Sequence, residues 1–141
     1  MKLERYAENP ILTPDPGSSW ESGAVFNPGA ALGPDGLVYL LYRAIPAGYT
    51  PFPDRPGYVN YISSIGCAVS RDGRHFERRS QPTLTPDTEA DCHGCEDARV
   101  NPLTVEGQTT YLLTYTGHDK LAWSGRGGRI GLAQTHDFFS F

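Results

Sequence analysis

The chain contains an internal repeat, and this repeat restricts its possible folds more than any other feature. Four short segments of the first half return in the second half in the same order. The pairs are NPILTP (9–14) and QPTLTP (81–86), GAVFNP (23–28) and DARVNP (97–102), VYLLY (38–42) and TYLLT (110–114), and IGCAVSRD (65–72) and IGLAQTHD (130–137). One repeated segment can arise by chance, whereas four in the same order indicate a duplicated unit. The two copies span about residues 9–80 and 81–141.

Each unit is predicted to consist of short β-strands joined by turns. The expected strands are 23–32, 37–44, 62–70 and 74–79 in the first unit, and 97–105, 109–116 and 129–135 in the second. Tight-turn residues, GPDG (33–36) and EGQ (106–108), separate the first two strands of each unit. The content of 16 glycines and 12 prolines among 141 residues also favours strands and turns over long helices. No segment shows sustained helical periodicity.

Four-stranded antiparallel units that repeat along a chain are typical of β-propeller blades. A two-sheet sandwich is the alternative, but it does not require the same loop pattern twice. Two blades cannot close a propeller, and the second unit stops at Phe141, where its fourth strand should begin. We therefore expect an all-β fold that is the N-terminal part of one β-propeller domain, or an obligate partner of another chain. Such a small core predicts low stability for the chain alone.

Charge and composition disfavour several classes of partner. The net charge is −4, and acidic residues interrupt the densest basic stretch, RDGRHFERR (71–79), so nucleic-acid binding is not expected. The sequence has no apolar run long enough to span a membrane, and its first residues do not resemble a signal peptide. Three cysteines in such a chain favour reduced thiols and a cytoplasmic location.

The meander topology predicts where the long loops lie. Successive connections in a meander alternate between the two ends of the sheet, so 15–22, 45–61, 86–96 and 117–128 should share one end. The aromatic residues of these loops are Trp20, Tyr49, Phe52, Tyr58, Tyr61 and Trp123. Exposed aromatic rings suit stacking on sugars, although the same rings also serve to cover the edges of blades. Function is therefore expected at this end.

The repeat also serves as an internal control, because a residue present in both units is expected to be structural. Asn27 returns as Asn101, which favours a structural role. Asp97 stands where the first unit has Gly23, and this difference makes it a functional candidate. The other differing positions at the same end are Arg43 against Tyr115 and Arg99 against Val25.

Asp97 is a candidate acid with two neighbours that matter. Adjacent residues of a regular strand point to opposite sides, so Glu96 and Asp97 are not expected to act at one point. They are therefore not the paired carboxylates of a two-residue glycosidase. Arg99 points the same way as Asp97, which permits a purely structural ion pair that would lower the pKa of the acid.

The segment CHGC (92–95) has the spacing of some metal and redox sites. A structural zinc site needs four ligands, and the sequence offers no second cysteine pair. Cys92, His93 and Cys95 remain three conceivable ligands, but structural or incidental thiols are the favoured interpretation, and no metal is expected. The other histidines, His75, His118 and His136, are isolated in the sequence.

Together the motifs resemble glycoside hydrolase family 130, the β-mannoside phosphorylases and related hydrolases. The matching pieces are NPILTP (9–14), VFNPGA (25–30), LLYRA (40–44), SSIGCAVSRDGRHFE (63–77), GCEDARV (94–100), YLLTYTG (111–117) and IGLAQTHDF (130–138). They follow the family order across nearly the whole chain. The resemblance implies a five-bladed β-propeller, of which this chain is about the N-terminal two fifths.

The resemblance also implies a reaction. A β-mannosidic bond is cleaved with inversion, inorganic phosphate is the co-substrate without any cofactor, and mannose 1-phosphate is released. Asp97 matches the proton-donating aspartate of the family, and Asn27 and Arg43 match residues expected to contact mannose. Arg99 is expected to orient the acid. The proline that usually follows the aspartate is Ala98 here, which loosens the backbone but leaves the acid in place.

Three alternatives stay open. The phosphate-binding residues and the proposed bases of the family lie beyond Phe141, so a hydrolytic β-mannosidase remains possible, and the chain alone is expected to be inactive. A non-catalytic carbohydrate-binding propeller fragment and a furanoside-cleaving five-bladed relative are the other two. The expected partners are a β-mannoside oligosaccharide, phosphate and a second copy of the chain in a homo-oligomer.

Overall fold

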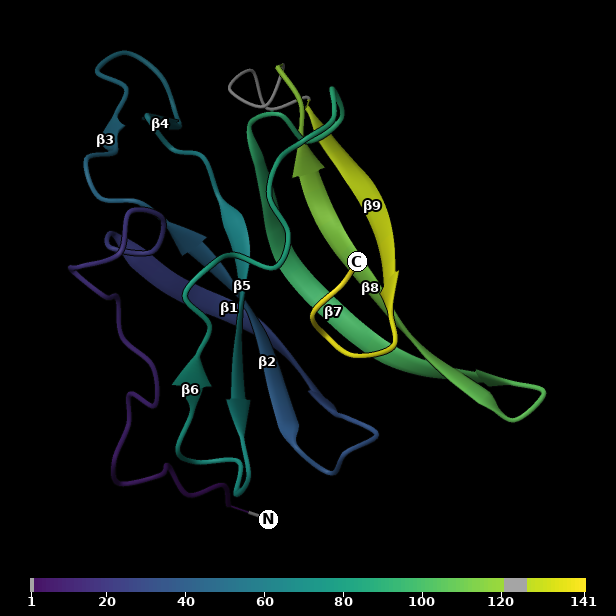
Figure 1. Ribbon diagram of the computed structural model, residues 1–141. Coiled ribbons are helices and arrows are strands. Elements are labelled where there is room, and N and C mark those ends of the chain that lie inside the picture. The colour runs from purple at the N-terminus through teal and green to yellow at the C-terminus, as the bar shows by residue number, and fades with distance from the viewer. Residues whose placement is uncertain (1, 121–126) are drawn as a thin grey trace.

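The computed structural model describes residues 2–120 and 127–141, which form strands, turns and loops but no helix (Figure 1). The first sheet has the order β1 (Ala24–Leu32), β2 (Val38–Ile45), β5 (Ser64–Ser70) and β6 (Glu77–Arg78). The second has the order β7 (Gly94–Val105), β8 (Gln108–His118) and β9 (Gly128–Thr135). All strand pairs of these sheets are antiparallel. The predicted all-β class and the meander order are confirmed.

Two features of the first sheet differ from the prediction. The long loop after β2 carries a small hairpin, β3 (Thr50–Pro51) and β4 (Tyr58–Val59). The expected fourth strand over 74–79 is reduced to the two residues of β6. Asp72 Oδ1 accepts hydrogen bonds from the backbone amides of Arg74 and His75 at 2.9 Å. This turn holds the chain away from the ladder until β6 begins.

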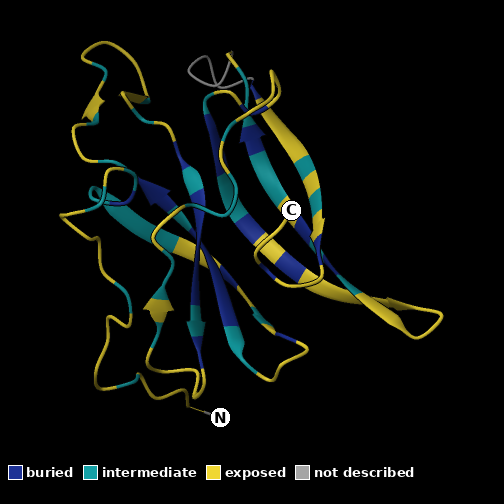
Figure 2. Cartoon of the chain, in the orientation of Figure 1, coloured by how far each residue is buried: buried dark blue, intermediate teal, exposed yellow. Residues whose placement is uncertain are grey.

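The hydrophobic core lies between the two large sheets, and its buried positions run along the middle of the strands (Figure 2). Its buried members are Tyr39, Leu41, Ile65, Cys67, Cys95, Ala98, Val100, Tyr111, Leu113 and Phe138. Phe138 follows β9 and stacks on Tyr39 with ring centroids 4.1 Å apart. The C-terminal segment therefore helps to join the sheets, and this packing fixes β7 against β1 and β2.

Strands β1 and β7 approach each other closely at one point. A Cβ atom added to Gly29 would lie 2.5 Å from the carbonyl oxygen of Ala98, so only glycine fits there. The contact brings the first half of β1 beside the first half of β7, and these are the segments that carry Asn27 and Asp97.

The two sheets repeat one side-chain arrangement. In each, a tyrosine of the middle strand lies over a glycine of the next strand and donates a hydrogen bond to a carboxylate. The two sets are Tyr42, Gly66 and Glu21 (hydrogen bond 2.8 Å) in the first sheet, and Tyr115, Gly131 and Asp91 (3.0 Å) in the second. A Cβ atom on either glycine would lie less than about 3 Å from the ring, which real structures avoid.

Both sheets also contain a β-bulge at the same position. In β1 the register shifts between Phe26 and Gly29, and in β7 it shifts between Glu96 and Arg99. Each bulge lies opposite the tyrosine of its middle strand. Asn27 and Asp97 are the first bulged residues, with φ values of 49° and 54°. Asparagine and aspartate tolerate this left-handed conformation better than most residues do.

The bulges correct the alignment of the repeat. The counterpart of Asp97 is Asn27, and the prediction that it is Gly23 was wrong. Asn101, which the repeated Asn-Pro letters matched to Asn27, instead pairs regularly with Leu112 in the ladder. Aligning the repeats by identical residues failed because the two bulges are equivalent in structure but differ in sequence.

Long connections gather at one end of the sheets, where the β3–β4 hairpin and the loop that precedes β7 lie (Figure 1). Not all the aromatic residues expected there are available to a ligand. Trp20 stacks on Tyr42 with ring centroids 6.3 Å apart, and its indole N–H donates to Ser80 O at 3.2 Å. Trp20 therefore covers the first sheet, and Trp123 lies outside the described residues.

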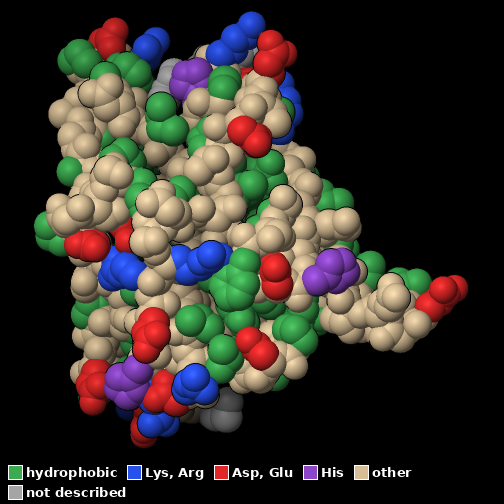
Figure 3. Space-filling model, viewed as in Figure 1, with side chains coloured by type: hydrophobic (Ala, Val, Ile, Leu, Met, Phe, Trp, Pro, Cys, Tyr) green, Lys and Arg blue, Asp and Glu red, His purple; other side chains and the backbone are tan. Residues whose placement is uncertain are grey.

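Acidic and basic side chains are interspersed over the face seen in Figure 3. Within the described part of the chain, the search for a helix long and apolar enough to cross a membrane found none.

Candidate active site

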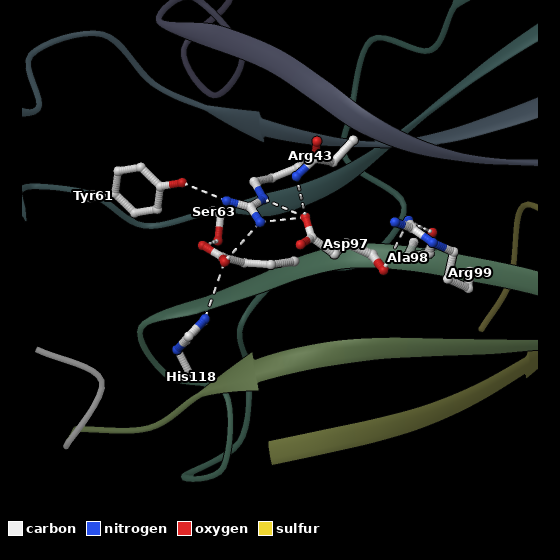
Figure 4. Close-up of polar contacts among 9 residues, drawn as sticks. Arg43, Tyr61, Ser63, Asp97, Ala98, Arg99 and His118 are labelled. Atoms are coloured by element: carbon white, nitrogen blue, oxygen red, sulfur yellow. Dashed lines mark hydrogen bonds and ion pairs between the residues drawn. The ribbon is translucent and has the colours of Figure 1, made fainter. Parts of the chain in front are cut away.

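Asn27, Arg43 and Asp97 meet where β1, β2 and β7 lie side by side, as Figure 4 shows for the last two. Asn27 Nδ2 donates a hydrogen bond to Asp97 Oδ1 at 2.9 Å. Arg43 Nε donates to the same oxygen at 3.0 Å, and Arg43 Nη2 also contacts it. The guanidinium group further lies over the ring of Phe26, 4.7 Å from the centroid. The positions that the family motifs marked are thus one cluster.

The two oxygens of Asp97 have different surroundings. All three donor atoms converge on Oδ1, whereas no described residue hydrogen-bonds Oδ2. The side chain of Asp97 is 36% exposed, compared with 12% for Arg43. The carboxylate of Asp97 is therefore anchored through Oδ1, and Oδ2 remains accessible to a ligand.

The pKa of Asp97 is set by opposing effects. Partial burial raises it, but the hydrogen bonds from Asn27 and Arg43 and the charge of Arg43 outweigh burial, and the net pKa lies below the usual range. Arg99 adds a smaller effect in the same direction.

Arg99 does not make the side-chain ion pair that its spacing permitted. Its Nη1 atom donates to the backbone carbonyl of Ala98 at 2.8 Å and, more weakly, to that of Asp97 at 3.3 Å. The arginine that pairs with the Asp97 carboxylate is Arg43. Arg99 instead binds the carbonyl groups of the bulge, where the ladder is interrupted.

Glu96 also reaches Arg43, and the expectation that Glu96 and Asp97 cannot act at one point was wrong. Arg43 Nη2 lies 3.0 Å from Glu96 Oε2 and contacts Asp97 Oδ1 as well. Strict alternation applies to a regular strand, and the bulge at Asp97 breaks it. One guanidinium group therefore bridges two neighbouring carboxylates.

The Glu96 side chain is only 12% exposed and is held on every side. Ser63 Oγ donates to its Oε1 atom at 3.0 Å, and His118 Nε2 lies 3.1 Å from Oε2. Burial raises the pKa of Glu96, but His118 and Arg43 together lower it below its ordinary value. The hydrogen bond to Glu96 in turn raises the pKa of His118.

A pocket of about 220 Å³ opens beside Arg43, and Tyr61 is one of its walls. Its lining residues are Arg43, Gly57, Tyr58, Tyr61, His93, Glu96 and His118. Tyr61 accepts a hydrogen bond from Arg43 Nη1 at 3.0 Å and stacks on Tyr58 with centroids 5.5 Å apart. Tyr49 meets both rings edge-on. The β3–β4 segment thus brings tyrosine rings to the arginine that holds Asp97.

The two cysteines of CHGC lie in different environments. Cys92 is exposed, and its Sγ atom lies 3.2 Å from His93 Nδ1. Cys95 is buried and donates weakly to Asp91 Oδ2 at 3.8 Å, and burial raises the pKa of its thiol. Among residues 2–120 and 127–141, no group of three or more His, Cys, Asp or Glu side chains is arranged to hold a metal ion.

Sequence reasoning passed over Glu96, His118 and Ser63. A usable signal for one of them was present, because a meander places the end of its second strand beside the start of its first. His118 ends β8 and pairs with Gly94 at the start of β7, two residues before Glu96. Ser63 had no such signal, because its contact depends on how the first sheet packs against the second.

The architecture described above is part of an antiparallel β-propeller with a carboxylate–arginine cluster at one end. The profile of glycoside hydrolase family 130, described as beta-1,4-mannooligosaccharide phosphorylase, matches residues 3–141. The chain therefore belongs to glycoside hydrolase family 130. The related solved structures are five-bladed β-propellers, and the two sheets correspond to part of such a fold.

Two relatives come from Thermoanaerobacter sp. (strain X514). A 1,2-beta-oligomannan phosphorylase is 38% identical over 117 residues, covering 83% of this chain and 36% of that protein. A beta-1,2-mannobiose phosphorylase is 33% identical over 124 residues, covering 87% and 39%. A glycosyl hydrolase from Bacteroides ovatus matches with a TM-score of 0.78 at 28% identity, covering 99% of this chain and 40% of that one. The chain thus spans about two fifths of the length of these proteins.

Proposed function

We propose that the protein carrying this chain is a β-mannoside phosphorylase, which cleaves β-mannosidic bonds with inorganic phosphate and releases mannose 1-phosphate with inversion. The observation that carries the proposal is that Asp97 Oδ2 accepts no hydrogen bond from the described residues, whereas both oxygens of the neighbouring Glu96 carboxylate are engaged. Phosphate is itself a nucleophile, so phosphorolysis needs one protein acid and no protein base.

Each residue of the cluster has a proposed task. Asp97 carries the proton on Oδ2 and delivers it to the leaving sugar, directly or through a sugar hydroxyl. Asn27 and Arg43 hold Oδ1 and contact the mannose unit, and Arg99 fixes the bulge that presents the acid. A bound sugar displaces water from Asp97, which raises its pKa towards the range where a proton is available. Inorganic phosphate is the co-substrate, and no cofactor is required.

The names of the relatives support a β-1,2 linkage. Both Thermoanaerobacter proteins are phosphorylases of β-1,2-linked mannosides, whereas the family profile is described by a β-1,4 activity. The two individual relatives, at 38% and 33% identity, favour β-1,2-mannobiose as substrate.

The test is a product analysis with the protein that carries this chain. β-1,2-Mannobiose and β-1,4-mannobiose are each incubated with and without inorganic phosphate, and the products are separated and quantified. Phosphate-dependent mannose 1-phosphate from the β-1,2 isomer is expected. Free mannose formed without phosphate would identify a hydrolase, and binding without turnover would identify a carbohydrate-binding module.

Two further properties belong to the same proposal. The free thiols of Cys67, Cys92 and Cys95 support a reducing, cytoplasmic location. The second is a homo-oligomer of the protein that carries this chain, which light scattering after size exclusion measures directly.

A further inference from the structure

Arg43 Nη2 serves two acceptors at once. It lies 3.0 Å from Glu96 Oε2 and also contacts Asp97 Oδ1. A guanidinium nitrogen of this kind carries two hydrogens, so the two carboxylates together use both. Nη1 donates one of its two hydrogens to the hydroxyl of Tyr61 at 3.0 Å. The hydrogen bonds from the guanidinium group to Asp97 all end on Oδ1, and none is drawn to Oδ2 (Figure 4).

Glu96 holds its place independently of Asp97. Ser63 binds one of its oxygens and His118 the other, at 3.0 and 3.1 Å. Because Ser63 precedes β5 and His118 ends β8, these tethers come from both large sheets. Glu96 thus acts as a fixed acceptor for Arg43 Nη2 that does not depend on Asp97.

We infer that Glu96, fixed by Ser63 and His118, is a positioning residue that keeps Arg43 on Oδ1 of Asp97 and so leaves Oδ2 free to carry the proton. The inference rests on the proposed function of Asp97 as the proton donor. Arginine and a carboxylate prefer a two-pronged pair in which both oxygens accept hydrogen bonds. With Glu96 as a competing acceptor, Nη2 is held back from that geometry.

Loss of Glu96 would release this restraint. Nη2 would turn towards Oδ2, and the resulting two-pronged pair would stabilise the ionised form of Asp97 more strongly. The acid would then lose its proton at lower pH. Charged and titratable groups face the cluster from several elements. They are Arg43 from β2, Tyr58 from β4, Tyr61 from the segment after β4, His93 from the loop before β7, Glu96, Asp97 and Arg99 from β7, His118 from β8, and Asp119 after β8.

The first test is a crystal structure of the protein carrying Glu96→Ala, at neutral pH and without substrate. We expect Arg43 Nη2 within hydrogen-bond distance of Asp97 Oδ2. The matched Glu96→Gln variant retains a side-chain oxygen for Arg43, and there the wild-type contact to Oδ1 alone is expected. An unchanged Arg43 in Glu96→Ala would overturn the inference. If Glu96→Ala does not fold, His118→Ala with Ser63→Ala removes both tethers and must shift Arg43 instead.

The second test is the pH profile of phosphorolysis. In Glu96→Ala we expect kcat to fall about tenfold at neutral pH, because the alkaline limb moves down by about one pH unit. The KM should change by less than about twofold, since Arg43 and Asn27 remain. Glu96→Gln should retain most of the activity, and Glu77→Ala, on the distant strand β6, is the control. A loss of kcat with an unmoved alkaline limb would indicate a merely structural role.

The two tests separate this inference from the proposed function. The position of Arg43 is observed without any turnover, so it is informative even if the protein proves to be a hydrolase or a binding module. Conversely, phosphorolysis that survives Asp97→Asn would refute the role of the acid and leave the crystallographic result standing.

Discussion

Asn27 and Asp97 occupy the same bulge position in successive sheets, and the amide of the first donates a hydrogen bond to the carboxylate of the second at 2.9 Å. Both residues have a left-handed backbone, with φ of 49° and 54°. The bulge that directs Asp97 into the site from β7 is thus also present in β1. There it directs the side-chain amide of Asn27 towards Asp97. Two copies of one structural device form the two sides of the site.

This symmetry predicts the effect of Asn27→Asp. Aspartate suits the bulge conformation as well as asparagine does, so the backbone should be unchanged. The second carboxylate would repel the first and raise the pKa of Asp97. The alkaline limb of the kcat profile for phosphorolysis should therefore move up by about one pH unit, opposite to the shift expected for Glu96→Ala.

Asn27→Gly serves as the comparison, because glycine keeps the bulge but removes the hydrogen bond without adding charge. It should lower activity and leave the alkaline limb close to, or slightly above, its wild-type position. An unmoved or lowered limb in Asn27→Asp would show that the added carboxylate does not repel Asp97 in the protein that carries this chain.

The duplicated unit could be predicted because turn residues and strand patterns recur in the sequence itself. The first three strands of each unit were predicted close to their observed bounds for that reason. The bulges could not be predicted in the same way, because Phe26-Asn27-Pro28 and Glu96-Asp97-Ala98 share no letters. Their equivalence is visible only in the pairing of β1 with β2 and of β7 with β8.

The site could be predicted in part. Asn27, Arg43 and Asp97 lie in motifs, so family resemblance located them. Glu96 was dismissed because the alternation rule assumes a regular strand, and His118 because it is alone in the sequence. Glu96 meets Arg43 through the packing of one sheet on the other, which no local pattern of the sequence encodes. His118 meets Glu96 within one sheet, through the pairing of β8 with β7.

A stability prediction concerns the glycines beneath the tyrosine rings. A Cβ atom at Gly66 would lie 2.5 Å from the Tyr42 ring and 2.7 Å from Trp20. Gly66→Ala should therefore lower the free energy of unfolding by about 1–3 kcal/mol, the usual cost of overpacking. Gly131→Ala, beneath Tyr115, should behave alike. Urea unfolding followed by circular dichroism measures both.

Gly128→Ala provides the control for this pair. Gly128 is also in a strand, but an added Cβ there has no neighbour within 4 Å. Its free energy of unfolding should stay within about 0.5 kcal/mol of the wild type. Equal losses in all three variants would mean that the cost comes from the backbone and not from the rings.

The proposed role of Asp97 as the proton donor makes a direct prediction for Asp97→Asn. The amide keeps the size of the side chain and its hydrogen-bond acceptor but has no proton to deliver. Phosphorolysis should fall by about 10²–10⁴-fold in kcat, the usual contribution of general acid catalysis. Glu77→Gln, the same chemical change at the far end of the sheet, should have no effect. A residual rate above about one tenth of the wild type would reject Asp97 as the donor.

The Glu96–His118 pair predicts how stability depends on pH. The hydrogen bond to Glu96 raises the pKa of His118 above its ordinary value of 6.5, so the stability it adds is complete below pH 6.5 and is lost as pH rises through the raised pKa. Burial raises the pKa of Glu96, but His118 and Arg43 lower it below 4.5 overall. The stability that ionised Glu96 adds is complete above pH 4.5 and is lost as pH falls through its lowered pKa.

The two effects define a window for comparing the wild type with His118→Gln, which keeps a hydrogen-bond donor but has no charge. The difference in the free energy of unfolding should be greatest, at about 1 kcal/mol, between roughly pH 4.5 and 6.5. It should shrink on both sides of this window. Chemical denaturation at a series of pH values measures the difference, and a difference that does not vary with pH would show that His118 supports Glu96 by packing or hydrogen bonding alone.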